Sequence, residues 1–339
     1  MRRILHVIQS IDPRGGGPIA GIHALREADQ AQRHEILSLD DPDSDLVRSS
    51  LTPVSAVGPA GFLGYARGLI PWLSRHAQSY DIVVIHGLWR FHSFGSWLAL
   101  RRRPVPYFVH VHGMLDPWFN EQYPLKRLKK SLFWPWTEYR VLRDAAAVIF
   151  TSEDERERAR RSFAPYRCRE TVIPYGIAPP PGDPARLRDD FLQRFPNLRG
   201  KRLFLYLSRI HPKKGCDLLV EAFAQHASAD PRLQLVMAGP DQVDWVKDLK
   251  EQASRLGIAD RIHWPGMLEG DLKWGAFHAA EVFVLPSHQE NFGIVVVEAL
   301  ACGTPVLISR GVQIWREIES TGAGLVEADD LAGTQRLIE

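Results

Sequence analysis

Residues 282–300 read VFVLPSHQENFGIVVVEAL, and this stretch displays the structural unit from which most of the chain is built. The short apolar run Val282–Leu285 predicts a buried strand, a polar loop follows it, and the segment that contains Glu298 then predicts a helix. Strands that are apolar throughout and alternate with helices are typical of a parallel sheet covered on both faces.

The same unit recurs on both sides of this stretch and predicts doubly wound α/β architecture. The other runs that predict strands are Ile4–Ile8, Glu35–Leu39, Ile82–Ile85, Tyr107–Val111, Ala147–Phe150, Thr171–Ile173, Leu203–Leu207, Leu233–Ala238, Arg261–Trp264 and Pro305–Ser309.

The repetition breaks once, at the proline-rich segment Ile177–Pro184, which can continue neither a helix nor a central strand. A length of 339 residues also exceeds the roughly 100–200 residues of a typical domain. We therefore predict a first Rossmann-like domain over residues 1–175, a linker over 176–200 and a second domain over 201–339. Open parallel sheets bind ligands at the carboxyl ends of their strands, so a cleft between the two domains is the expected site.

The composition excludes several classes of protein. A net charge of +2 gives little support for nucleic-acid binding, and no apolar stretch approaches the roughly 18 residues of a membrane span. The three cysteines (Cys168, Cys216 and Cys302) are widely separated, which predicts neither a disulfide framework nor a zinc site and fits a reducing cytoplasm.

A glycine cluster, Gly15–Gly17, follows the first predicted strand, and Pro18 suits the first turn of a helix. A strand, a glycine turn and a helix start together form an anion site, although a plain turn explains the residues as well.

Two basic residues, Arg209 and Lys214, follow the first strand of the second domain in SRIHPKKG (208–215). A guanidinium and an ammonium group are suited to neutralise the charge of a diphosphate leaving group. The alternative is a solvated basic turn, which is our interpretation of Lys213.

Glu290 and Glu298 lie eight residues apart in the loop and helix after Val282–Leu285. A carboxylate at Glu298, beside three valines, needs a polar partner, and ribose hydroxyls would provide one. The alternative is that Glu298 faces outward. An anion cradle is also expected from the backbone amides of Asn291, Phe292, Gly293 and Ile294.

His110 and His112 close a first-domain strand, and His86 ends the preceding one in a similar way. A histidine at such a strand end can donate to a substrate hydroxyl, but a lone histidine is usually structural. The His-x-His spacing also resembles a metal site, yet no cysteine or carboxylate partner is evident, so we predict no metal.

The segment Lys126–Lys130 is rich in basic residues and precedes the aromatic segment Phe133–Trp136. Such a combination suits an anionic membrane surface, and a solvated helix face is the alternative.

Taken together, these motifs resemble the retaining glycosyltransferases of family 4, which have the GT-B fold. The most specific match is Glu290 to Glu298, which resembles that family's E-x7-E signature, and SRIHPKKG is similarly close. The resemblance implies that Glu290 binds the donor sugar, Glu298 the nucleotide ribose, and Arg209 and Lys214 the diphosphate. It also implies donor contacts from Gly16, Gly17 and His112, and a nucleobase site at Met267 and Leu268.

The function implied is retaining transfer of a hexose from a nucleotide-diphosphate sugar to a glycan or lipid-linked acceptor, with no metal or other cofactor. HGMLDPW (112–118) is also similar to bacterial enzymes of lipopolysaccharide or exopolysaccharide synthesis. A cytoplasmic enzyme, peripheral to the inner face of the plasma membrane, is expected. Residues 330–339 predict the start of a helix. The family's last helix, which packs back on the first domain, is expected to be missing after it. The alternatives are a nucleotide-sugar epimerase, a glycan phosphorylase or a non-catalytic sugar-nucleotide-binding subunit.

Overall fold

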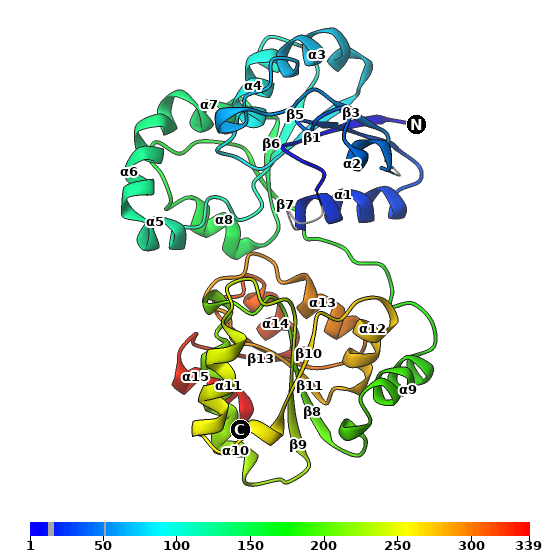
Figure 1. Cartoon of the computed structure of the whole chain (residues 1–339). Coiled ribbons are helices and arrows are strands. Elements are labelled where there is room, and N and C mark those ends of the chain that lie inside the picture. Colours follow the sequence, from blue (N-terminus) through cyan, green and yellow to red (C-terminus); the bar gives the residue numbers. More distant parts are fainter. Residues whose placement is uncertain (13–16, 51) are drawn as a thin grey trace. The chain divides into compact units, whose positions relative to one another are not determined.

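The chain divides into two units, Met1–Ala178 and Pro179–Glu339, in the computed structural model, which describes residues 1–12, 17–50 and 52–339. Each unit is a doubly wound α/β domain of the predicted class, with a parallel sheet and helices packed on it (Figure 1). The order of the strands in each sheet decides where ligands can bind.

The first domain has a seven-stranded sheet, in the order β3-β2-β1-β4-β5-β6-β7, within the described part of the chain. Its strands are β1 (Arg3–Ile8), β2 (Arg33–Ser38), β3 (Val54–Ala56), β4 (Ile82–His86), β5 (Tyr107–His110), β6 (Ala147–Phe150) and β7 (Glu170–Val172). Its helices are α1 (Gly17–Ala28), α2 (Asp45–Arg48), α3 (Leu69–His76), α4 (Phe91–Leu100), α5 (Trp118–Gln122), α6 (Pro124–Phe133), α7 (Glu138–Arg143) and α8 (Glu153–Ala159).

The second domain has a six-stranded sheet, in the order β10-β9-β8-β11-β12-β13. Its strands are β8 (Arg202–Leu207), β9 (Leu233–Ala238), β10 (Ile262–Gly266), β11 (Val282–Leu285), β12 (Val306–Ser309) and β13 (Gly324–Glu327). Its helices are α9 (Pro184–Arg194), α10 (Cys216–Ala227), α11 (Val246–Arg255), α12 (Gly270–Ala279), α13 (Ile294–Ala301), α14 (Trp315–Thr321) and α15 (Leu331–Ile338). Helices α10, α11 and α15 pack together on one side of this sheet, and α9 packs on α12 on the other (Figure 1).

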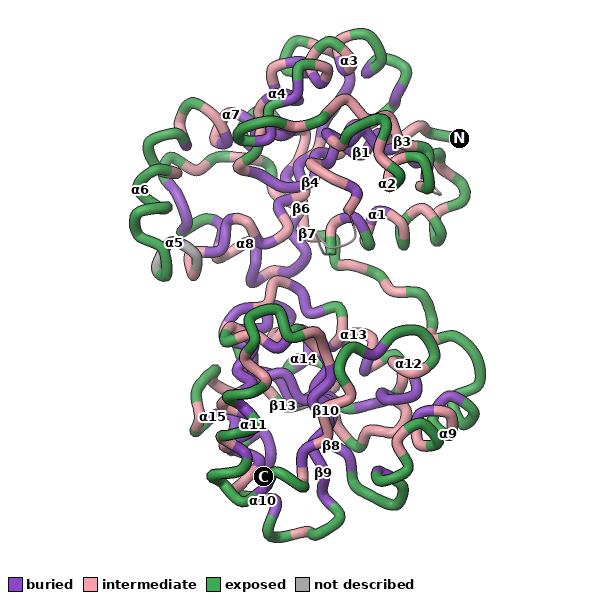
Figure 2. The backbone as a smooth tube through the Cα atoms, viewed as in Figure 1, coloured by how far each residue is buried: buried purple, intermediate pink, exposed green. Residues whose placement is uncertain are grey.

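The strands form the core of each domain, because helices cover both faces of each sheet. Val83, Val109 and Val148 in the first domain, and Phe283 and Val284 in the second, are fully buried. Figure 2 shows the same pattern, with buried strands and more exposed outer helices. Continuously apolar strands in the sequence are explained by this two-sided burial.

In both sheets the order in which successive strands are added reverses next to the first strand of the domain. In the first domain the reversal lies between β1 and β4, and in the second between β8 and β11. At such a point the loops that leave the two adjacent strands diverge to opposite faces of the sheet, which opens a crevice for ligands.

The structure differs from the prediction in two strands and in the linker. Strands β3 and β13 were not predicted, and both are short edge strands that are not fully buried. Residues 184–194, inside the range predicted as linker, are helix α9, whose Leu187 and Phe191 are buried against the second domain. Asp183 caps this helix by accepting a hydrogen bond from the Arg186 amide, and Pro184 begins it.

The expected helical start at residues 330–339 is observed as α15, which packs on α10 and β13. Within the described ranges, every helix is too short or too polar to cross a lipid bilayer.

Candidate functional site

The loops that follow β8 and β11 meet at the reversal point of the second sheet. The backbone amide of His288 donates to the carbonyl of Lys213 at 2.9 Å, so the two loops are joined directly. Gly215 makes this approach possible: it has a φ of +63°, and a Cβ there would lie 2.2 Å from the Pro286 carbonyl oxygen. The predicted Arg209–Lys214 and Glu290–Glu298 segments are therefore neighbours.

Lys214 and Glu290 form an ion pair at this junction. The Lys214 side chain is 4 % exposed and the Glu290 side chain 22 %, so an ammonium group that is almost buried is compensated by a partly accessible carboxylate. A buried charge needs such a partner. The pair offers one positive and one negative group, side by side, to a ligand that carries both phosphate and hydroxyl groups.

A substitution at Gly215 tests whether the close approach of the two loops matters. Gly215→Ala is expected to destabilise the protein by about 2–4 kcal/mol, from left-handed backbone strain plus overpacking against Pro286. Gly303→Ala is the matched control, because Gly303 also has a positive φ but nothing lies within 4 Å of its added Cβ. Urea unfolding of both variants gives the comparison, and equal destabilisation would contradict a special role for Gly215.

The Glu290 loop is held in place by its own backbone. The Glu290 amide donates to the Gly311 carbonyl at 2.9 Å, and the Glu290 carbonyl accepts from the Gln313 amide at 3.0 Å. Gly293, with a φ of +73°, then turns the chain into α13, as the predicted anion cradle requires. Of the other cradle residues, Phe292 is buried, Asn291 is half-buried and Ile294 is exposed.

Glu298 lies in α13 and forms an ion pair with Lys273 of α12, with 2.8 Å between Nζ and Oε1. Its side chain is 13 % exposed, so the alternative of an outward-facing carboxylate is wrong. Sequence reasoning missed Lys273, because 25 residues separate the pair and nothing in their spacing indicates contact. The pair ties α13 to α12, which begins at Gly270, two residues after Leu268.

The remaining predicted residues of the second domain follow strands β8 and β10 at the same edge of the sheet. Arg209 is exposed, and its Nη1 donates to Gln242 Oε1 at 3.3 Å. Met267 (61 % exposed) and Leu268 (6 %) follow β10, two strands away from β8. Neighbouring strands are about 4.8 Å apart, so these segments lie about 10 Å apart along the sheet edge. This is room for an extended ligand.

In the first domain, His112 follows β5 in a tight turn, with a positive φ at both His112 and Gly113. The buried carboxylate of Glu155 fixes the turn by accepting from the Gly113 amide at 2.5 Å and from the Thr151 hydroxyl at 2.7 Å. Glu155 is 3 % exposed although it stands in a helix rich in charged residues. Gly17 begins α1, with Pro18 in its first turn, whereas Gly16 lies outside the described residues.

His112 belongs to a buried group of imidazoles. Its Nε2 lies 2.9 Å from His86 Nδ1, and its Nδ1 bonds to the hydroxyl of Tyr175. Burial lowers the pKa of His86 and of His112 well below the ordinary value and that of His110 to about 4. All three rings are therefore neutral at neutral pH, and each keeps one nitrogen lone pair available.

Two family models match the chain and together cover most of it. The model described as "Glycosyl transferases group 1" matches residues 188–332, and "Glycosyl transferase 4-like domain" matches residues 16–176. The first match spans the Lys214, Glu290 and Glu298 site and the second spans the histidines.

Named relatives and a solved structure agree with these models. The chain is 29 % identical over 260 residues to D-inositol 3-phosphate glycosyltransferase of Geodermatophilus obscurus, covering 74 % of this chain and 56 % of that protein. It is 25 % identical over 334 residues to GDP-mannose:cellobiosyl-diphosphopolyprenol alpha-mannosyltransferase of Xanthomonas campestris, covering 96 % and 83 %. The chain thus spans little more than half the length of the inositol phosphate glycosyltransferase. HepE of Anabaena, solved with UDP and glucose, superposes with a TM-score of 0.73 at 22 % identity, covering 100 % of this chain and 90 % of that one.

Proposed function

The chain belongs to the group 1 glycosyl transferases and has their GT-B fold, and from this we propose that it transfers a sugar from a nucleotide-diphosphate donor. The observation that carries the proposal is the Lys214–Glu290 pair at the reversal point of the second sheet. The buried ammonium group of Lys214, with Arg209, would neutralise the diphosphate, and Glu290 would accept hydrogen bonds from the sugar hydroxyls. Two fixed cations make a metal ion unnecessary for the donor.

The other predicted residues would contact further parts of the same donor along the edge of the sheet. Glu298, oriented by Lys273, would accept from the ribose hydroxyls. Met267 and Leu268 would contact the base, and the amides of the Asn291–Ile294 loop would hold phosphate oxygens. In the first domain, Gly16, Gly17 and His112 remain the residues that the resemblance assigns to the donor, and the Glu155 carboxylate fixes the turn of His112 by accepting from the Gly113 amide.

The mechanism we propose retains the anomeric configuration of a hexose. The bond from C1 to the leaving phosphate oxygen breaks while the acceptor oxygen bonds to C1 on the same face, and the departing phosphate takes the acceptor's proton. The acceptor would be a glycan or a lipid-linked sugar in lipopolysaccharide or exopolysaccharide synthesis. The Xanthomonas relative, which is named for a diphosphopolyprenol-linked acceptor, supports the lipid-linked choice.

Incubation with UDP-, GDP- and ADP-sugars, with and without an extract of lipid-linked acceptors, tests this mechanism. We expect nucleoside diphosphate release that depends on the acceptor, and a product whose anomeric proton coupling matches that of the donor. A product of inverted configuration would contradict retention. Conversion of the donor to its epimer without acceptor would instead support the epimerase alternative.

Helix α6 supports a further part of the proposal, peripheral binding of the enzyme to the cytoplasmic face of an anionic membrane. Leu125, Leu128 and Leu132 are 83 %, 61 % and 67 % exposed, and Phe133 and Trp136 extend the same exposed surface. Figure 2 shows this helix exposed along its length. Four basic residues and no acidic one accompany the leucines, which matches a lipid surface of negative charge (Lys126, Arg127, Lys129 and Lys130).

Changing Lys126 and Lys129 to Glu is expected to weaken binding to vesicles that contain anionic lipid by at least about 30-fold, since each basic residue near the surface contributes about 1 kcal/mol. Lys130 is left unchanged because its ammonium group packs 4.3 Å from the Trp89 ring centre. Sedimentation with anionic and with neutral vesicles measures the effect. The same change at the exposed Lys201 and Lys247 is the control, and equal weakening in both variants would contradict a role for α6.

A further inference from the structure

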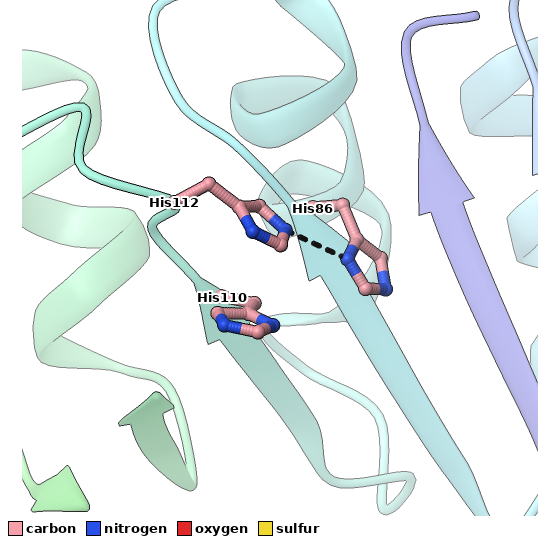
Figure 3. Close-up of side chains that lie close together, drawn as sticks. All are labelled: His86, His110 and His112. Carbon is pink, nitrogen blue, oxygen red and sulfur yellow. Dashed lines mark hydrogen bonds between the residues drawn. The ribbon is translucent and has the colours of Figure 1, made fainter. Parts of the chain in front are cut away.

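Three histidines meet at the carboxyl ends of two neighbouring strands in the first domain. His86 ends β4 and His110 ends β5, and the parallel register places these two residues side by side. His112 follows two residues later and points back toward His86 (Figure 3). One ring nitrogen from each of the three lies within 4.8 Å of the others.

Ring nitrogens of the three histidines could act as metal ligands through their lone pairs. His86 Nδ1 and His112 Nε2 lie 2.9 Å apart, and the tautomers of the two rings decide whether either nitrogen carries a proton. His110 Nε2 is buried and makes no hydrogen bond within the described part of the chain. A buried ring nitrogen without a hydrogen bond costs stability unless a ligand binds it. The neighbouring side chains of His86 and His112 are imidazoles and carry no fixed charge.

The outward nitrogens of His86 and His112 already have partners. His86 Nε2 lies 2.9 Å from His6 Nδ1, and His6 Nε2 lies 3.0 Å from His34 Nδ1. The chain of rings ends near the surface, where His34 Nε2 is 3.7 Å from the carboxylate of Asp29. On the other side, His112 Nδ1 bonds to Tyr175.

One set of tautomers compatible with these contacts leaves two nitrogens bare. If His34, His6 and His86 each carry their proton on Nε2, each donates along the chain toward Asp29. If His112 carries its proton on Nδ1, it donates to the Tyr175 oxygen. His86 Nδ1 and His112 Nε2 are then both bare, 2.9 Å apart. Hydrogen bonds to the outer nitrogens are the usual means by which proteins orient histidine ligands of a metal.

We propose that His86, His110 and His112 bind a Zn²⁺ ion, with water as the fourth ligand. Neutral imidazoles suit zinc, whereas Mg²⁺ and Ca²⁺ prefer oxygen ligands. Zinc–nitrogen bonds of about 2.0–2.1 Å place ligand nitrogens about 3.3 Å apart in a tetrahedron. The rings of His110 and His112 are stacked with centroids 3.9 Å apart, so one of the two must turn out of the stack for the three nitrogens to reach that spacing. We named these three histidines from the sequence but predicted no metal, because no cysteine or carboxylate partner was evident.

An effect of the bound ion on sugar transfer is also expected, and this expectation rests on the proposed function. His112 is the first-domain residue expected to touch the sugar, and zinc would occupy the nitrogen that faces its neighbours. Zinc is therefore expected to inhibit transfer reversibly. Binding itself is measured without donor or acceptor, so failure of the zinc site and failure of the transferase proposal are distinguishable.

The test uses the untagged full chain, stripped of metal, titrated with Co²⁺ and then with Zn²⁺. We expect one Co²⁺ ion per chain, with the intense visible absorption of a tetrahedral site, and its displacement by Zn²⁺. His110→Ala, which removes a ligand but no hydrogen bond, should weaken Co²⁺ binding at least 100-fold. Tyr175→Phe removes only an outer partner and should weaken it about 10- to 100-fold.

The exposed His76→Ala is the control and should bind Co²⁺ like the unaltered protein. Circular dichroism of each variant checks that it is folded. No tetrahedral absorption in the unaltered protein, or equal Co²⁺ affinity in the folded His110→Ala variant, would overturn the proposal.

Discussion

Replacing Lys214 by Met is expected to lower kcat/KM for sugar transfer by about 10²–10³-fold, the usual cost of removing one group that stabilises charge in a transition state. Its ammonium group is almost buried beside Glu290, where water cannot replace it. The methionine keeps the volume and removes the charge, so the loss reports electrostatics rather than packing. Initial rates at several donor concentrations give the value.

Lys213→Met is the matched control, because Lys213 is the adjacent lysine and its backbone carbonyl, which joins the two loops, is unchanged by the substitution. It should change kcat/KM by less than about threefold, well below the cost of a charged catalytic group. Equal losses in the two variants would contradict the assignment of the diphosphate to Lys214.

Acidification is expected to destabilise the first domain steeply below pH 6.5. Burial lowers the pKa of His6 to about 3 and the pKa values of His92 and His110 to about 4. These residues stay neutral in the folded protein but bind protons in the unfolded chain once the pH falls below about 6.5. Their stabilising contribution is therefore present above pH 6.5 and is lost as the pH falls toward 4, by about 1.4 kcal/mol per pH unit for each.

Glu138 opposes this trend, because burial raises its pKa to about 7 and the folded state keeps its proton while the unfolded state loses it above about 4.5. Its contribution grows by about 1.4 kcal/mol per unit as the pH falls through that window. His6, His92 and His110 against Glu138 leave a loss of roughly 3 kcal/mol per unit between pH 6 and 5, and the lowered pKa values of His86 and His112 act in the same direction.

Urea unfolding from pH 4.5 to 7.5, with EDTA present, measures this dependence of stability on pH. His110→Gln should reduce the slope by about 1.4 kcal/mol per pH unit, and the exposed His76→Gln should leave it unchanged. A stability that is flat between pH 6.5 and 5 would contradict buried, neutral imidazoles.

The fold could be predicted from sequence wherever helices cover both faces of a strand. Val282–Leu285 is apolar at every position, and the structure has β11 over the same residues. Edge strands lack this signal: Val54–Ala56 and Gly324–Glu327 are only half-buried or exposed, so their residues need not be apolar. Helix α9 was hidden by the prolines before it, although Asp183-Pro184 is a helix-start signal.

The site could be predicted only as far as parallel strands bring their carboxyl ends together. This explains why the loops of Lys214 and Glu290 meet. Lys273 could not be predicted, because its partner Glu298 lies in another helix, 25 residues away. Glu155 could not be predicted, because in the sequence it resembles an ordinary surface charge. The contact between His86 and His6 could not be predicted either, because their strands are adjacent in the sheet but the two residues are 80 apart along the chain.

The most direct test of the account is a calorimetric titration of the protein with UDP-, GDP- and ADP-sugars, beside Lys214→Ala and Glu290→Ala. We predict that one nucleotide class binds and that both variants weaken its binding by at least tenfold while remaining folded. Failure of every donor to bind the folded protein, or undiminished binding in both variants, would contradict a nucleotide-sugar site at the Lys214–Glu290 pair.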